Sequence, residues 1–476
     1  MEIQQSLINL FEKWSGEKVV DFIPLPESTS ARKYYRIGSG NKRAIGAFNC
    51  DLRENRAFIY LAKHFRRNGL HVPAIYSAEL KNNIYLVEDL GDTTLFSLIN
   101  KNSGAQFDKS MVSVYKDAIE ELPRFQINGS KKLDYSYCYP RARFDRRSMM
   151  WDLNYFKYYF LKLAGIRFDE QKLEDDFITL TSFLLRADSN YFLYRDFNSR
   201  NIMITDRGPY FIDFQGGRKG PLQYDIASIL FDSNANIPQP AREELLNVYI
   251  AAVRKTKPVK RIDFLRYYHG YILIRLLQMF GAYGFRGYFE GKAHFLKSIP
   301  LTVKDLVWLL PNLPSSIRIP ELITTLDLII ASSKLPNFDQ APDEPEKLTV
   351  RITSFSYRDR IPPDFSGNGG GFIFDCRAIP NPGRYPEYKT LNGTDKPVRD
   401  FLEAQPEVRD FLTSTFSLAG QSVEKYISNK WTSLMISYGC TGGQHRSVYS
   451  AEKLGRYLRE KYNVNVIVHH SKLKSK

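Results

Sequence analysis

Short apolar runs and one helical stripe alternate in the first hundred residues of this 476-residue chain. Residues 44–48 and 84–88 are brief apolar runs that predict strands. Between them, residues 54–68 carry apolar side chains at helical spacing, which predicts an amphipathic helix. This pattern indicates a small, sheet-rich lobe at the start of the chain.

From about residue 110 to residue 330 the periodicity becomes mainly helical. Long aromatic and aliphatic stripes over 152–163 and 263–280 predict helices packed into a core. Two short apolar runs, 202–204 and 210–212, predict a pair of strands within this region. The pattern therefore predicts a larger helical lobe after the sheet-rich one.

Residues 335–347 break the pattern, because they contain three prolines and four acidic residues and have little to bury. We predict a domain from 1 to 334, a linker from 335 to 347 and a second domain from 348 to 476. After the linker, four predicted strands alternate with helices, as in an α/β domain. These strands are 348–353, 371–374, 434–437 and 464–468.

Charge and cysteine content narrow the functional classes. The net charge is +15, and residues 347–476 hold +8 of it, so the second domain is the stronger candidate for binding anions. Four cysteines without CxxC spacing fit reduced thiols better than a disulfide framework or a zinc ribbon. No apolar run reaches the roughly 18 residues of a membrane helix, and the start of the sequence lacks a signal-peptide pattern. We expect a cytoplasmic protein without a membrane partner.

Asp196 and Asn201 stand five positions apart just before the strand 202–204, and Asp213 follows the strand 210–212. Phosphoryl transfer needs a carboxylate near the acceptor hydroxyl and oxygen ligands for magnesium. The spacing predicts Asp196 as the catalytic base, and Asn201 and Asp213 as the metal ligands.

The first domain resembles the aminoglycoside phosphotransferase-like kinases, and among them the cell-wall amino-sugar kinases that act on N-acetylmuramate and N-acetylglucosamine. The resemblance implies an α+β, bilobal, protein kinase-like fold that uses ATP and Mg²⁺. It also implies that residues 28–33, with Lys33 among them, cover the nucleotide phosphates, that Glu88 and Leu90 form the hinge at the adenine, and that Asp225 braces the catalytic loop. Capping of a helix that starts at Ile226 is the alternative role for Asp225. The stretches that carry the resemblance are 31–37, 86–92, 194–203 and 212–228.

Two departures from the family pattern leave a pseudokinase open. Tyr194 replaces the histidine that is common before the Arg-Asp pair, and the strand 44–48 lacks the usual phosphate-binding lysine. Lys33 or Lys42 are the candidate substitutes. The arginines between residues 141 and 147 favour a neutral or anionic acceptor, such as an amino sugar, over a polycationic one.

The second domain contains a glycine-rich loop between the strand 434–437 and a predicted helix that starts near Ser447. Converging backbone amides, a helix N-terminus and Arg446 together predict a phosphate cradle. The same loop has the Cys-x-x-Gly-x-x-Arg-Ser spacing of cysteine-dependent phosphatases, in which Cys440 would be the nucleophile. Asp375 is the one candidate for the general acid of that reaction.

Nearly the whole second domain resembles the C-terminal domain of the RapZ family of RNase adapter proteins, through residues 374–382, 391–398 and 439–448. The resemblance implies a sensor of glucosamine-6-phosphate that binds a small RNA and presents it to an endoribonuclease, with oligomerisation as a further property. The P-loop module that precedes this domain in the family is absent, because the sequence has no GxxxxGK[ST] motif. The sugar-phosphate residues implied are Asp375, Arg377, Asn381, Thr441, Gly442, Gly443, His445 and Arg446.

Together these patterns predict an ATP-dependent sugar kinase fused to a smaller α/β sensor domain. Two alternatives remain, an RNA-binding adapter with a kinase-like scaffold and a Cys440-dependent phosphatase.

Overall fold

The computed structural model describes residues 2–26, 32–101, 107–332, 347–359, 361–362, 364 and 370–473. The described residues divide into two compact units. The first unit falls within 1–281 and 301–332, and the second within 282–300 and 333–476.

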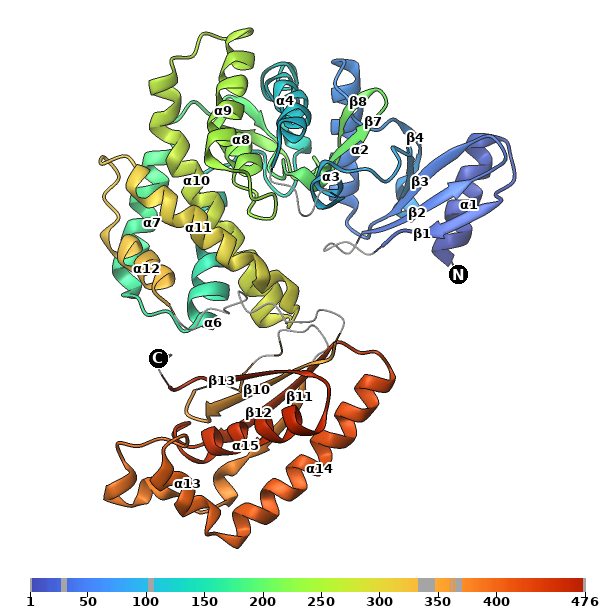
Figure 1. Ribbon diagram of the computed structural model, residues 1–476. Coiled ribbons are helices and arrows are strands. Elements are labelled where there is room, and N and C mark those ends of the chain that lie inside the picture. The colour runs from blue at the N-terminus through green and yellow to red at the C-terminus, as the bar shows by residue number, and fades with distance from the viewer. Residues whose placement is uncertain are drawn as a thin grey trace. The chain divides into compact units, whose positions relative to one another are not determined.

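The first unit begins with a five-stranded antiparallel sheet, counted over the described residues, in the order β1-β2-β3-β5-β4. Helix α1 (Glu2–Ser15) covers one face of this sheet and buries Leu7 and Phe11 against Ile37 and Leu86 (Figure 1). The predicted strands 44–48 and 84–88 are confirmed as β3 and β5. The strands are β1 (Asp21–Pro24), β2 (Lys33–Gly38), β3 (Arg43–Phe48), β4 (Ile75–Glu79) and β5 (Ile84–Val87).

Helix α2 (Leu52–Arg67) confirms the helix predicted over 54–68. It begins at Asp51, whose carboxylate accepts hydrogen bonds from the backbone amides of Arg53 and Glu54. Its buried stripe includes Phe58, which stacks on Phe214 with ring centroids 5.0 Å apart. The helix therefore joins the sheet to the segment that carries Asp213.

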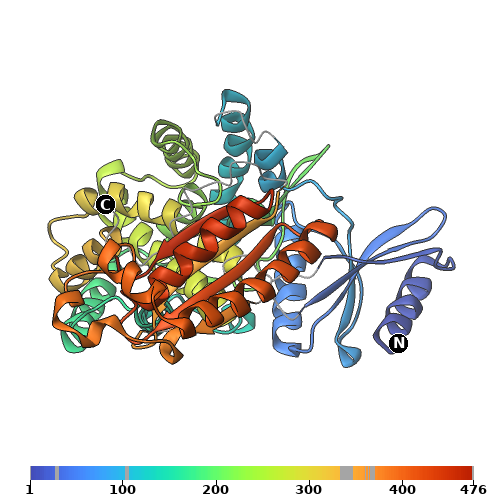
Figure 2. The same ribbon diagram turned by 60° about the horizontal axis from the view of Figure 1, so that its bottom comes forward.

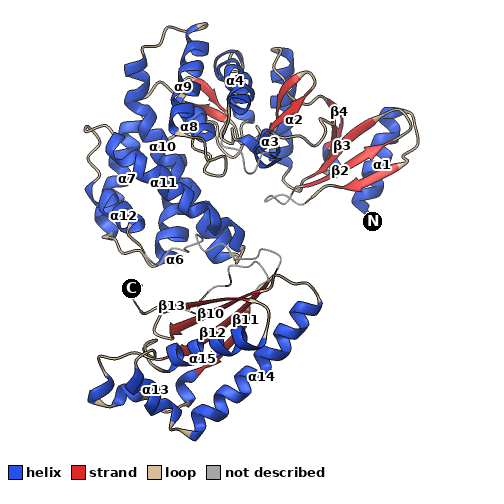
Figure 3. Ribbon diagram, viewed as in Figure 1, coloured by secondary structure: helices blue, strands red, loops and turns tan. Residues whose placement is uncertain are grey.

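The rest of the first unit is mostly helical, as Figure 3 shows. Helix α4 packs against α9, and α7 packs against α12. Two short hairpin-like pairs, β7 with β8 and β6 with β9, lie within this lobe. The region 152–163 is helical as predicted, but Phe156–Leu161 forms a π-helical turn between α5 and α6. The helices are α3 (Leu95–Lys101), α4 (Lys109–Pro123), α5 (Arg146–Tyr155), α6 (Lys162–Ala164), α7 (Glu170–Leu184), α8 (Gln223–Leu230), α9 (Gln239–Arg254), α10 (Arg261–Tyr283), α11 (Ile299–Leu309) and α12 (Pro320–Ile330), and the strands are β6 (Tyr191–Leu193), β7 (Ile202–Thr205), β8 (Gly208–Phe211) and β9 (Arg218–Gly220).

The second unit contains a parallel sheet of four described strands in the order β11-β12-β10-β13. Helices α14 and α15 both lie along one face of this sheet, as Figure 2 shows from below. All four strands predicted after the linker are confirmed, and β12 extends further than predicted, to Cys440. The elements are β10 (Thr349–Ser356), β11 (Gly371–Asp375), α13 (Lys396–Glu403), α14 (Pro406–Ser428), β12 (Ser433–Cys440), α15 (Arg446–Lys461) and β13 (Asn465–His470).

A bilobal α+β unit followed by a smaller α/β domain is therefore confirmed as the fold class. Within the described residues, no helix is long and apolar enough to cross a membrane.

Gly281 tests the packing of α10 on α5. A Cβ at this position would lie 2.9 Å from the backbone nitrogen of Phe156 and 2.9 Å from the carbonyl carbon of Tyr155. We expect Gly281→Ala to lower the free energy of unfolding by about 1–3 kcal/mol through overpacking. The control is Gly40→Ala, because a Cβ at Gly40 would meet nothing within 4 Å. Chemical denaturation of both variants checks this, and an unchanged midpoint for Gly281→Ala would show that the helices can separate without cost.

Candidate functional site

The loop after β6 is held by the carboxylate of Asp225, which is fully buried. This carboxylate accepts hydrogen bonds from the backbone amides of Tyr194 (2.8 Å) and Arg195 (3.0 Å), and from Nε2 of Gln126 (3.0 Å). Burial raises the pKa of Asp225 to about 6. Helix α8 begins at Gln223, so Asp225 lies inside the first turn and braces the loop instead of capping the helix.

Arg195 is fixed on both its backbone and its side chain. Its φ of 81° is in the left-handed region, which non-glycine residues rarely adopt. Its guanidinium donates to both carboxylate oxygens of Asp152, at 2.6 and 2.8 Å, and to the hydroxyl of Tyr224 at 2.7 Å. This anchoring fixes the orientation of the next residue, Asp196, in the loop.

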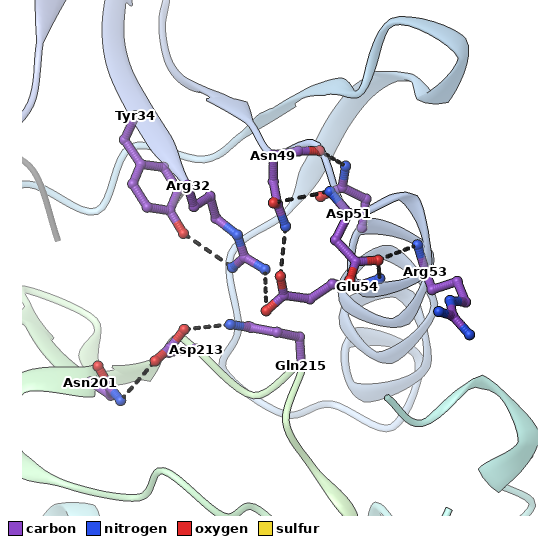
Figure 4. A network of polar contacts seen from close by, with 10 residues as sticks. Arg32, Tyr34, Asn49, Asp51, Arg53, Glu54, Asn201, Asp213 and Gln215 are labelled. Carbon is purple, nitrogen blue, oxygen red and sulfur yellow. Dashed lines mark hydrogen bonds and ion pairs between the residues drawn. The ribbon is translucent and has the colours of Figure 1, made fainter. Parts of the chain in front are cut away.

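Asn201 connects the two aspartates of the predicted site. Its side-chain amide donates to the backbone carbonyl of Asp196 at 2.8 Å and to Oδ2 of Asp213 at 3.3 Å. The other oxygen of Asp213 accepts from Nε2 of Gln215 at 2.5 Å (Figure 4). The structure therefore brings Asp196, Asn201 and Asp213 together, as their spacing predicted.

Burial raises the pKa of Asp213, and the nearby charge of Asp196 raises it further. A carboxylate in such a place is ready to receive a cation. Magnesium typically takes one or two protein oxygens and completes its shell with phosphates and water. Asp213 and the amide oxygen of Asn201 fit that role. Among the described residues, no group of three His, Cys, Asp or Glu side chains could hold a metal ion by itself.

The predicted hinge residues Glu88 and Leu90 follow β5 directly. The carboxylate of Glu88 is occupied, because it accepts from Nη2 of Arg207 at 2.6 Å and from the backbone amide of Ala74 at 3.1 Å. Leu90 is half-buried. The Glu88 carboxylate thus ties the end of β5 to Ala74 and Arg207, and the hinge stays a prediction.

The second unit places the predicted anion loop between the end of β12 and the start of α15. The thiol of Cys440 accepts a hydrogen bond from the backbone amide of Gly443 at 3.2 Å. Gly443 has a φ of 70°, which favours glycine. Ser356, at the end of β10, donates through Oγ to the carbonyl of Thr441 at 2.7 Å. The loop is thus closed on itself and tied to the neighbouring strand.

The other predicted sugar-phosphate residues gather around this loop. Asp375 is paired with Gly439 in the sheet register, and Arg446 donates through Nη1 to the carbonyls of Arg377 (3.1 Å) and Ile379 (3.0 Å). Nε of Arg446 is buried and has no hydrogen-bond partner in the described part of the chain. An anion would supply that partner.

His445 and Asn381 also lie at this edge of the loop. Nε2 of His445 donates to the carbonyl of Tyr388 at 2.9 Å. Oδ1 of Asn381 accepts from the amide of Gly383, and a Cβ built on Gly383 would lie 3.3 Å from the His445 ring. Thr441 and Gly442 are exposed at the mouth of the loop. All eight predicted residues therefore belong to one region.

Comparisons with known proteins assign both units. Residues 21–262, about half of the chain, match the family model described as the phosphotransferase enzyme family. The chain belongs to the phosphotransferase enzyme family. Residues 348–474 match the RapZ C-terminal domain. The two resemblances found in the sequence are confirmed.

The matches to curated relatives cover only part of each relative's length. A nucleotide-binding protein of Xylella fastidiosa strain M12 is 37% identical over 128 residues, which is 27% of this chain and 42% of that protein. A nucleotide-binding protein of Nitrosomonas europaea is 39% identical over 126 residues, 26% of this chain and 41% of that protein. The chain thus spans less than half the length of these relatives.

Two solved structures are similar at low identity. The ethanolamine kinase of Plasmodium vivax is 16% identical with a TM-score of 0.45, covering 62% of this chain and 84% of that protein. The choline kinase of Cryptosporidium parvum is 13% identical with a TM-score of 0.43, covering 64% of this chain and 98% of that protein.

Several residues of this phosphotransferase family member were not predicted from its sequence. Arg32 falls within the stretch 28–33 that the resemblance implies at the nucleotide phosphates, but the sequence did not single it out. It is buried, while the neighbouring Lys33 is exposed on β2. Lys33 remains a prediction, because no contact places it beside Asp213. Side-chain alternation along a strand was the signal that separates the two positions, but it required knowing which face is covered.

Lys472 and His470 are the unpredicted residues of the second unit. The side chain of Lys472 packs over Gly443 and pairs with Asp359 at 2.9 Å. His470 contacts Ser354 through Nδ1 and Glu452 through Nε2, each at 2.9 Å. These contacts fix the end of β13 and so place Lys472 beside the loop.

Two adjacent glycines test the loop geometry. Gly443→Ala should destabilise the loop by about 1–3 kcal/mol, because its φ is positive and the new Cβ would lie 2.9 Å from the amide nitrogen of Ser356. Gly442→Ala is the matched control, since a Cβ there meets nothing within 4 Å. Hydrogen exchange at residues 438–446 would detect the difference. Equal exchange in both variants would refute a strained turn at Gly443.

Proposed function

We propose that the first unit is an ATP-dependent kinase that phosphorylates a hydroxyl group of an amino sugar such as N-acetylmuramate or N-acetylglucosamine. One observation carries the proposal. Asp196 and Asn201 lie in one loop and Asp213 follows the β7–β8 hairpin, and the amide of Asn201 contacts both aspartates, at 2.8 and 3.3 Å. Family membership supports the reaction class.

In this proposal each residue of the site has one task. Asp196 accepts the proton of the acceptor hydroxyl as that oxygen attacks the terminal phosphorus of ATP, and the bond from that phosphorus to the bridging oxygen breaks to release ADP. Asn201 and Asp213 hold Mg²⁺, which would neutralise charge on the phosphates. Leu90 and the backbone of Glu88 meet the adenine. Asp225 keeps the loop in position by accepting hydrogen bonds from two backbone amides.

The surroundings of Asp196 support an acceptor that is not a polycation. Arg195 and Arg218 are both largely buried on this side of the loop. Burial, and after it the charge of Arg195, lowers the pKa of Arg218 to about 10. A cationic acceptor would add repulsion to two arginines that already repel each other. A neutral or anionic sugar would not.

The kinase proposal is tested by replacing its base. We expect Asp196→Asn to lower kcat by about 10²–10⁴-fold, because the amide cannot accept the proton. Asp213→Ala should abolish Mg²⁺-dependent ATP binding. Asp206→Asn, in the exposed turn between β7 and β8, is the control and should leave turnover unchanged. The assay is ADP release across a panel of amino sugars.

The possible outcomes distinguish enzyme from scaffold. Turnover that survives Asp196→Asn would contradict the kinase. Wild-type protein that binds ATP but turns over no sugar would favour the scaffold with an adapter role.

For the second unit we propose binding of glucosamine-6-phosphate, with a small RNA and an endoribonuclease as partners of the whole chain. The loop supports binding over phosphatase chemistry. Cys440 is only 2% exposed, and Nη1 of Arg446 is engaged with two backbone carbonyls. The Arg377 ion pair lowers the pKa of Asp375, so this carboxylate is a poor proton donor. The hydrogen bond from Gly443 to the Cys440 thiol is the feature that favours a phosphatase.

Cys440→Ser separates the two activities. A phosphatase needs a thiolate to attack phosphorus, whereas a binding loop needs only an acceptor for the Gly443 amide, which a serine oxygen provides. We expect Cys440→Ser to bind glucosamine-6-phosphate within about threefold of the wild type, with no phosphate released by either protein. Arg446→Ala should weaken binding at least tenfold, as expected for a charge-assisted contact. Calorimetry and a phosphate assay measure both. Phosphate release by the wild type that Cys440→Ser abolishes would establish the phosphatase.

A further inference from the structure

Strand β3 has no lysine, although kinases of this architecture use a lysine of that strand, paired with a glutamate on the following helix, to hold the nucleotide phosphates. Lys33 pairs with Phe48, the last residue of β3, in the sheet register, so the residue before Lys33 lies next to the end of β3. That residue is Arg32, whose side chain is 2% exposed and which directly precedes β2.

Arg32 makes the ion pair that the lysine would make. Its Nη2 lies 3.0 Å from Oε1 of Glu54, in the first turn of α2, and its Nη1 donates to the hydroxyl of Tyr34 at 3.3 Å. The second oxygen of Glu54 accepts from Nδ2 of Asn49 at 2.6 Å. Glu54 is therefore held on both oxygens, and it orients the guanidinium instead of moving with it.

The pair lies beside the metal-binding part of the site. In Figure 4 the Gln215–Asp213 pair is next to Glu54 and below the Arg32 guanidinium. A nucleotide whose magnesium is held by Asp213 would bring its phosphates to this position. A guanidinium presents several donors in one plane and binds phosphate oxygens in pairs, so an arginine can replace the lysine at this place.

A structural role alone explains the pair less well. Removing two opposite charges from water costs free energy that their attraction often does not recover, so a buried ion pair is weak support for stability. Phe58 also lies under the guanidinium, with its ring centroid 5.9 Å away, and an apolar side chain could fill that space. The cost of burying this charge is explained if a ligand uses it.

We infer that Arg32, oriented by Glu54, is the residue that positions the nucleotide phosphates, in place of the absent β3 lysine. This inference rests on the proposed kinase function. It assigns the phosphate contact to a residue one position before Lys33, and to the opposite face of the strand.

The test is the affinity for ATP, ADP, AMP and adenosine, measured by calorimetry with Mg²⁺ for the full chain. If Arg32 contacts phosphates, Arg32→Gln should raise the Kd of ATP about 10–100-fold and leave that of adenosine within about twofold. Arg32→Lys should recover part of the ATP affinity, because it restores the charge without the fork. Lys81→Gln, at an exposed position of the same lobe, is the control and should change nothing.

Glu54→Gln provides a second variant that keeps the shape of the pair. It should weaken ATP more than adenosine, but by less than Arg32→Gln, because Arg32 remains and loses only its anchor. An equal loss for all four ligands, or no loss for any, would overturn the inference and leave Arg32 a structural residue. A wild-type protein that binds adenosine and ATP equally would also overturn it. A wild type that binds no adenine nucleotide would overturn the proposed function itself.

Discussion

The first unit depends on one buried carboxylate, that of Asp225. A carboxylate without solvent is costly unless its oxygens accept hydrogen bonds, and here the backbone amides of Tyr194 and Arg195 and the amide of Gln126 provide them. The hydrogen bonds that offset this cost hold three segments of the chain in one fixed arrangement. Arg195 can then keep a left-handed backbone, which is worth about 1–3 kcal/mol of strain on its own. The fixed backbone of Arg195 then sets the position of the next residue, Asp196.

The same constraint recurs at Asp213, which also has a positive φ and is half-buried. The carboxylates of Asp196 and Asp213 would repel each other if no donor bridged the two residues. Asn201 is that donor, since its amide donates to the backbone carbonyl of Asp196 and to the carboxylate of Asp213 at the same time. A second carboxylate in place of Asn201 could donate to neither. The chemistry of the amide thus explains why this position is asparagine.

Local spacing explains how much of this could be predicted from sequence. Asp196, Asn201 and Asp213 lie within eighteen residues, so their approach depends on one loop and one hairpin that apolar patterning reveals. The glycine loop before α15 was predictable for the same reason. Arg32 could not be singled out within the stretch 28–33, because its partner Glu54 is on a helix and its direction depends on which face of β2 the helix α1 covers. Arg446 was predicted at the anion loop, but not the carbonyls of Arg377 and Ile379 that receive it, because those belong to a distant segment.

The two units provide for anions in opposite ways. In the first unit the carboxylates of Asp196 and Asp213 are close together, and the cations Arg32, Arg195 and Arg218 lie near them. A metal ion would offset the repulsion between these carboxylates and a phosphate. The loop of the second unit has backbone amides at a helix N-terminus, and its arginine is partly occupied by carbonyls. A phosphate there would be received by amides first and by Arg446 second. Such a site needs neither a metal ion nor a nucleophile to hold a phosphate. That is sufficient for a binding domain, whereas a phosphatase also needs a nucleophile.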